Sequence, residues 1–167
     1  MPEHSRTKVR FFMSYAHENA QLAGRFKNLI LEQMGPSKSY DYEIWQDDEQ
    51  LLPGVNWAEG IRDALKECDL GLLLISPSFL NSKFITDHEL PEFVGGNAKA
   101  CIPVMLGPIN LRRHDLKGLK TAQIFRYKTS NGQYKNLSDC NPRQRGQFCE
   151  QLFDKIENRL DRLSVKS

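Results

Sequence analysis

The chain has 167 residues, of which 40% are hydrophobic and 26% charged, the size and composition of one folded domain with its own core. Its formal net charge of +2 argues against a nucleic-acid partner, and no apolar run approaches the roughly 18–20 residues that span a membrane. The polar first eight residues contain no apolar signal segment, so we expect a cytoplasmic protein. Reduced thiols are then expected at all four cysteines, which are Cys68, Cys101, Cys140 and Cys149.

Strand-like and helix-like patterns alternate along the chain. Residues 1–7 are expected to be disordered, and one domain is expected over residues 8–164. Short β-prone or continuous apolar runs predict strands at residues 9–13, 42–45, 70–75, 101–106 and 122–127. Apolar residues at helical spacing predict helices over residues 19–34, from residue 56 to about 68, and from about residue 142 onward. The apolar stripe of the last helix consists of Phe148, Leu152, Ile156, Leu160 and Leu163.

The segment 77–94 predicts one interrupted helix or two short ones, because Pro91 cannot continue a smooth helix. The run 70–75 has no polar residue, which indicates a central parallel strand covered on both faces. We therefore expect an α/β fold, a flavodoxin-like three-layer sandwich around a five-stranded parallel sheet of order 2-1-3-4-5. Pro103 indicates that the fourth strand lies away from the centre of the sheet.

The strand order also predicts a ligand site. In such sheets, ligands bind outside the carboxyl ends of the strands where the order reverses, here strands one and three. The residues expected at these ends are Ser14, Tyr15, Ala16 and His17 on one side and the segment 76–79 on the other.

Four segments carry a family resemblance. They are FFMSYAHEN at 11–19, IWQDDEQLLPGVNW at 44–57, IRDALKECDLGLLLISPSFLNSKFITDHEL at 61–90 and CIPVML at 101–106. Each is weak alone, but their order and separation resemble the Toll/interleukin-1 receptor (TIR) domain, with the second segment corresponding to its BB loop. The similarity covers about residues 8–127 and is closest to bacterial members of the family.

The resemblance implies two activities. Some TIR domains are scaffolds that join other TIR domains, whereas many cleave the nicotinamide–ribose bond of NAD⁺, which is then a substrate and not a cofactor. Catalytic members carry a Glu in the helix after the third strand, usually four residues after an aromatic residue. Here Glu89 follows Phe84 by five residues, and His88 holds the fourth position. The form Ser-x-Phe-Ile-x-Asp-x-Glu-Leu-Pro resembles the bacterial group, so the resemblance assigns catalysis to Glu89.

The chemistry of NAD⁺ cleavage is consistent with a site that has a single catalytic carboxylate. Loss of nicotinamide leaves a ribosyl cation, which a nearby carboxylate stabilises, and the leaving group already bears a positive charge and needs no general acid. Aromatic faces for the bases of NAD⁺ are expected from Tyr15, Trp57, Phe79 and Phe84.

Each candidate has an alternative structural role. Glu89 and His17 are alternatively exposed surface residues, Asp47 a solvated loop residue, and Trp57 and Phe79 members of the core. The resemblance further implies self-association through the loop 47–55, a sensor domain or partner protein, and a role in bacterial antiphage defence or signalling.

Other functional classes lack their motifs. A receiver domain would have acidic residues where Ser14 and Ser76 stand, and no Gly-x-Gly-x-x-Gly, Walker loop, nucleophile elbow or zinc spacing is present, so no metal is expected. The remaining rival to the NAD⁺-cleaving enzyme is a non-catalytic TIR interaction module.

Overall fold

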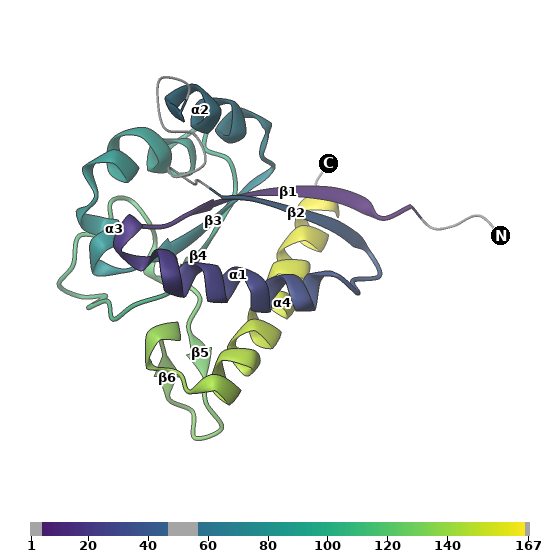
Figure 1. Cartoon of the computed structure of the whole chain (residues 1–167), viewed down its shortest axis with the longest axis vertical. Helices are drawn as coiled ribbons and strands as arrows, with labels where there is room; N and C mark the ends of the chain where they lie inside the picture. The colour runs from purple at the N-terminus through teal and green to yellow at the C-terminus, as the bar shows by residue number, and fades with distance from the viewer. Residues whose placement is uncertain (1–4, 47–56, 166–167) are drawn as a thin grey trace.

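The structure, a computed structural model, describes residues 5–46 and 57–165, without the side chains of residues 57, 58, 164 and 165 (Figure 1). The parallel strands are β1 (Thr7–Ser14), β2 (Tyr40–Gln46), β3 (Leu70–Ile75) and β4 (Cys101–Met105). The α-helices are α1 (Ala20–Met34), α2 (Trp57–Glu67), α3 (Pro77–Asn81) and α4 (Pro142–Val165). Short helical turns complete the chain, namely η1 (His17–Asn19), η2 (Ile85–Glu89), η3 (Leu90–Glu92), η4 (Thr121–Gln123) and η5 (Leu137–Asp139). The predicted alternation of strands and helices is confirmed.

The four strands form one parallel sheet of order β2-β1-β3-β4. All six residues of β3 are buried, as the uninterrupted apolar run predicted. In the register, Phe11 lies opposite both Ile44 of β2 and Leu70 of β3, so β1 and β3 are neighbours and the chain order reverses between them. The predicted switch point is therefore present.

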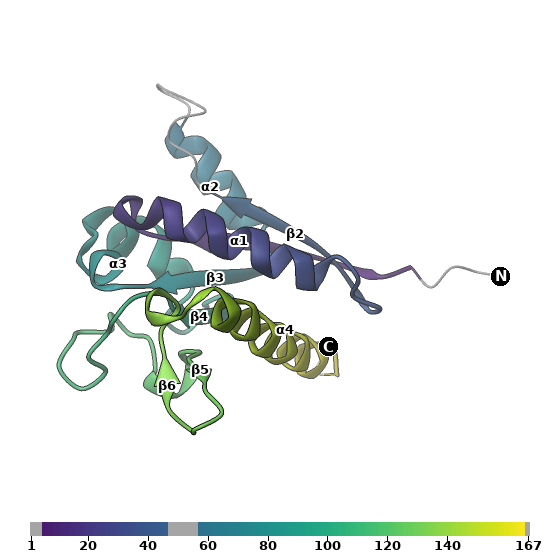
Figure 2. The same ribbon diagram turned by 60° about the horizontal axis from the view of Figure 1, so that its bottom comes forward.

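Helices cover both faces of the sheet, which makes the three predicted layers (Figure 2). Consecutive strand residues point to opposite faces. In β1, Phe11 and Met13 pack with α1 and α4, whereas Phe12 packs with α2 and α3. The same alternation divides β3, where Leu72 and Leu74 belong to the first face and Leu73 belongs to the second.

The predicted fifth parallel strand is wrong. Residues 122–127 enter η4, then touch β4 through a single parallel bridge, Val104 to Phe125, and then start the two-residue strand β5 (Tyr127–Lys128). β5 pairs antiparallel with β6 (Tyr134–Lys135) in a separate hairpin. The Phe125 N–H donates to the Pro103 carbonyl at 2.7 Å and its carbonyl accepts from the Met105 N–H at 2.8 Å, so the chain occupies the fifth position for one residue only. Pro103 thus lies on the outer strand of the four-stranded sheet, as predicted.

The helical segment after β3 is interrupted, as predicted, and it lies close to the sheet. Pro91 lies in the first turn of η3, where its missing N–H breaks no helical hydrogen bond. Phe93 then packs directly on β3 at Gly71, where an added Cβ would lie 2.6 Å from the Phe93 ring. Gly71 therefore lets this segment approach the sheet closely.

The last helix closes the first face. Four members of its predicted apolar stripe, from Phe148 to Leu160, are buried, whereas the last member, Leu163, is 37% exposed. Hydrogen bonds also tie α4 to β2: the Tyr42 hydroxyl donates to Glu157 at 2.8 Å and the Tyr40 hydroxyl to Asp161 at 2.6 Å.

The N-terminal boundary differs slightly from the expected one, because Thr7 already pairs with the sheet and donates its N–H to the Ser39 carbonyl. Residues 1–4 lie outside the described part. All four cysteines are free thiols, as predicted. No helix among the described residues has the length and apolar character needed to cross a membrane.

Candidate functional site

The carboxyl ends of β1 and β3 lie side by side and present two serines. Ser14 is the last residue of β1, and Ser76 directly follows β3. Ser76 caps α3 by accepting the Phe79 N–H at 3.0 Å, and its own hydroxyl donates to Asn19 Oδ1 at 2.6 Å. This second bond ties the loop after β1 to the loop after β3 across the switch point.

Glu89 enters the same region from a π-helical turn. The segment begins at Ser82, whose Oγ accepts the Ile85 N–H at 3.2 Å, and the turn η2 closes with the Leu90 N–H bonded to the Ile85 carbonyl, five residues back. A π-turn accommodates one more residue than an α-helical turn. Glu89 therefore lies, relative to Phe84, close to the direction that a residue four positions on would take in an α-helix. The five-residue spacing is thus absorbed by the backbone.

Glu89 and Ser14 meet in the interior. The Ser14 hydroxyl donates to Glu89 Oε1 at 2.6 Å, and the two residues are only 1% and 3% exposed. A hydrogen bond from a hydroxyl to a carboxylate of this length is in the strong range and fixes the orientation of the carboxylate. The two nearest carboxylates in sequence, Asp87 and Glu92, are exposed. Of the three acidic residues in this segment, only Glu89 lies in the interior at the switch point.

The other residues predicted after β1 are arranged around Ser14. Tyr15 is half-buried and its hydroxyl accepts a hydrogen bond from Gln46 Nε2 at 3.0 Å. Ala16 is buried, and His17 is exposed at the start of η1. The structure thus brings Ser14, Tyr15 and Ser76 to the same edge of the sheet as Glu89.

The predicted aromatic residues are placed less favourably. Phe79 is 0% exposed and packs in the core under α3, so it has no face open to a ligand in this conformation and its alternative role as a core residue is the one observed. Phe84 is half-buried against the same cluster, and its ring lies 4.9 Å from the ring of the exposed His88. Trp57 is the first residue of α2, and its side chain lies outside the described part, as do Asp47 and the loop 47–55.

Sequence reasoning missed two polar residues of this site, Asn19 and Gln46. Asn19 bonds to Ser76, and Gln46, the last residue of β2, bonds to Tyr15. The signal for Gln46 was available, because it ends a parallel strand beside β1 and so lies at the same edge as Ser14. Asn19 lies in a turn after β1, and its pairing with a residue 57 positions away has no local signature.

Within residues 5–46 and 57–165, no three His, Cys, Asp or Glu side chains gather closely enough to bind a metal ion. The described polar groups of the site are one buried carboxylate, two serine hydroxyls, the amides of Asn19 and Gln46, and the phenol of Tyr15.

In the comparison with known families, a family model described as a TIR domain matches residues 11–138. The match starts within β1, includes the switch point and Glu89, and ends in η5. Comparison with curated proteins finds no match.

Proposed function

Because this chain belongs to the TIR domain family, we propose that it is an NAD⁺ nucleosidase that cleaves the nicotinamide–ribose bond, with Glu89 as the catalytic carboxylate. The observation that carries the proposal is the hydrogen bond of 2.6 Å between Ser14 and Glu89 at the switch point. Open α/β sheets bind their ligands at this position, and the π-turn directs Glu89 toward it despite the extra residue after Phe84. A carboxylate held by a buried hydroxyl is oriented before the substrate arrives.

The proposed reaction breaks the bond between C1′ of the ribose and the ring nitrogen of nicotinamide. The electron pair of that bond goes to the nitrogen, which becomes neutral, so nicotinamide leaves without protonation. Positive charge develops on the ribose, where the Glu89 carboxylate stabilises it. Water then attacks C1′ and loses a proton, which gives ADP-ribose, or the adenine of the same molecule attacks and gives a cyclic product.

Ser14 acts in this scheme as a positioning residue, because its hydroxyl donates to Glu89 Oε1 and so fixes the orientation of the carboxylate. Tyr15 and Phe84 are the described aromatic residues with exposed surface that remain candidates for stacking on nicotinamide or adenine. Ser76, Ala16 and His17 complete the proposed binding edge.

Burial of Glu89 indicates how the activity is controlled. With 3% of its surface exposed, Glu89 reaches a substrate only after the residues that cover it move. Catalytic TIR domains, by the resemblance, gain activity when copies stack and the BB loop of one completes the site of the next. We propose the same self-association here. It uses a heterologous contact, which extends into open assemblies, and a sensor domain or partner protein triggers it. The proposed setting is antiphage defence or signalling in the bacterial cytoplasm.

The alternative function is a non-catalytic TIR scaffold. One observation favours it: a Glu that is almost fully buried and bonded to Ser14 also fits a purely structural role. The two proposals differ in a measurable product, since a scaffold releases no nicotinamide.

The test is incubation of concentrated protein with NAD⁺ and chromatography of the products. We expect nicotinamide release by the wild type and a loss on the order of 10²–10³ in rate for Glu89→Gln, which keeps the size of the side chain but removes its charge. The matched controls are Asp87→Asn and Glu92→Gln, which remove equal charges from exposed positions of the same segment and should retain activity. Full activity of Glu89→Gln would refute the role of Glu89, and no cleavage by assembled wild-type protein would favour the scaffold.

A further inference from the structure

A hollow that is separate from the switch-point site opens beyond the carboxyl end of β4. Its volume is about 720 Å³, which is within the usual range of about 300–1,000 Å³ for small-molecule sites. None of the residues that line it belongs to the group around Ser14 and Glu89. We call it the β4 pocket; its lining residues are Met105, residues 108–112, His114, Arg126, Tyr134 and Asn136.

The chain around this pocket is strongly basic, although the whole protein is nearly neutral. Residues 108–136 contain seven Lys or Arg residues and a single acidic residue, Asp115. The Asp115 carboxylate is already paired with Lys117 at 3.5 Å, so it offsets little of the remaining charge. The seven basic residues are Arg112, Arg113, Lys117, Lys120, Arg126, Lys128 and Lys135.

Two of these arginines, Arg112 and Arg126, line the pocket and have unused hydrogen-bond donors. Counting only partners within the described residues, the guanidinium groups of Arg112 and Arg126 make no hydrogen bond and no ion pair with a carboxylate. Arg126 stacks on Tyr134, with its Cζ 4.1 Å from the centre of a ring that is itself 52% exposed. Stacking uses the face of the guanidinium group and leaves its in-plane N–H groups free to bind an anion. Pairs of coplanar N–H groups in a guanidinium match the spacing of phosphate oxygens.

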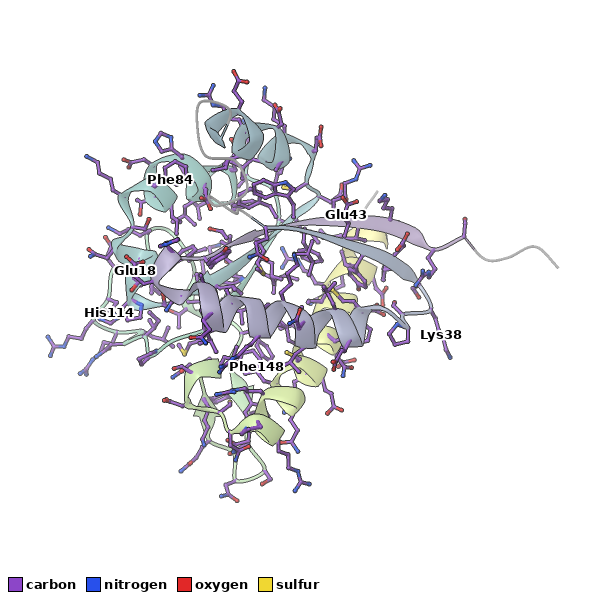
Figure 3. The ribbon with its side chains drawn as sticks, in the orientation of Figure 1. Glu18, Lys38, Glu43, Phe84, His114 and Phe148 are labelled. Carbon is purple, nitrogen blue, oxygen red and sulfur yellow. The ribbon has the colours of Figure 1, made fainter. Side chains whose placement is uncertain are left out.

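A third donor is held in place by the loop itself. Asn110 Oδ1 accepts the N–H groups of Arg112 and Arg113, at 3.1 and 3.0 Å, and the Asn110 N–H donates to His114 Nδ1 at 3.0 Å. Since Nδ1 is the acceptor, the neutral ring of His114 carries its proton on Nε2 and can donate it. In Figure 3, His114 lies on the same side of the molecule as Glu18 of η1 and far from Lys38.

Another part of the lining is apolar. Met105 at the end of β4, with Ile109 and Leu111 of the loop, provides surface that suits an uncharged ring. We propose that the β4 pocket binds a phosphate-bearing small molecule of nucleotide size, with the phosphates at Arg112, Arg126 and His114. A hollow with cationic side chains at one part and apolar side chains at another fits such a ligand better than it fits a uniformly charged polymer.

The test uses ADP and adenosine as probes, titrated calorimetrically into the full chain. We expect one ADP per chain and at least tenfold weaker binding of adenosine, which lacks the phosphates. Arg112→Gln and Arg126→Gln should each weaken ADP binding about tenfold, since each removes a charge-assisted contact. Arg112 is exposed, and its guanidinium is bonded to no described side chain, so its variant tests the site even if Arg126→Gln disturbs the β5–β6 hairpin. The matched control is Arg62→Gln on α2, which lies at the opposite end of the molecule from that hairpin and should bind ADP as the wild type does (Figure 1).

Three results would overturn the proposal. One is ADP binding that both pocket substitutions leave unchanged. Another is ADP binding that is lost in Glu89→Gln and retained in the pocket variants, which would place the nucleotide at the switch point. The third is tighter binding of a single-stranded oligonucleotide than of ADP, with a salt dependence of several charges, which would make the ligand a polymer.

Discussion

The hydrogen bond between Ser14 and Glu89 gives the most direct test of the site, through Ser14→Ala. The substitution removes one hydroxyl and changes the side-chain volume little, so the loss comes from the bond and not from a cavity. Both partners are buried, and the acceptor is a carboxylate, for which loss of a partner costs about 1–3 kcal/mol. For a chain of this size, a loss of about 2 kcal/mol lowers the melting temperature by roughly 4–8 °C.

The same change should affect catalysis in a specific way. If Ser14 orients the Glu89 carboxylate, kcat for NAD⁺ cleavage falls about 10–100-fold while KM stays nearly constant, because the lost alignment matters most in the transition state. Nicotinamide release and guanidinium unfolding are measured on the same preparation. The split between kcat and KM separates this role from a merely structural one.

The chain contains a matched control for this experiment. Ser37 is another buried serine whose hydroxyl donates to a glutamate, Glu157, but it lies in the turn before β2 and not at the switch point. Ser37→Ala should therefore destabilise the fold to a similar extent and leave kcat unchanged. If Ser14→Ala retains both the stability and the kcat of the wild type, or if both serine variants lose kcat equally, the assignment of Ser14 as a positioning residue is wrong.

Four further predictions follow from the packing and the proposed assembly. Leu73→Asp places a charge at a fully buried position of β3 and should abolish cooperative unfolding; a near-wild-type melting curve would contradict the central position of this strand. Lys99→Met removes the ammonium that bonds three carbonyls at the end of α2, at 2.6–2.9 Å, and should cost about 1–2 kcal/mol in denaturant unfolding; an unchanged midpoint would show that the cap is dispensable. Burial raises the pKa of Cys101 to about 11 and that of Cys149 to about 12. Above pH 9 the thiols of the unfolded chain therefore lose their protons while those of the folded chain keep theirs. The free energy of unfolding should fall between pH 9 and 12, and it should fall less steeply in Cys149→Ala. Finally, NAD⁺ cleavage should rise faster than linearly with protein concentration, and linear activity from a monomer at nanomolar concentration would exclude activation by assembly.

The sequence predicted those parts of the fold that depend on local periodicity. The apolar run of β3, the helical spacing in α1 and α4, and the interruption at Pro91 are properties of neighbouring residues, and all three are present in the structure. The prediction of a fifth strand was wrong because it too depended on local sequence alone. Residues 122–127 are β-prone, but only one of them, Phe125, pairs with β4 before the chain enters the β5–β6 hairpin. The length of the pairing therefore depends on the path of the following residues, which local sequence does not specify.

The site shows the same division. Strand order predicted where Ser14 and Ser76 would lie, and the family resemblance selected Glu89. The direction of Glu89, however, depends on a π-turn, which is a backbone adjustment with no dependable local signal. The burial of Phe79 in the core was not predictable, because a single aromatic residue after a strand has the same local sequence pattern whether or not a helix covers it.

What the sequence determined by itself was the identity and order of the layers, since hydrophobic period and turn residues act over a few positions. What only the tertiary structure decided was which distant polar groups meet. Ser14 and Glu89 are 75 residues apart, and Arg112 and Arg126, spread along a segment with no dense basic run, line one pocket. Such pairings follow from the register of the sheet and the packing of loops over its edge, and these depend on the whole chain at once.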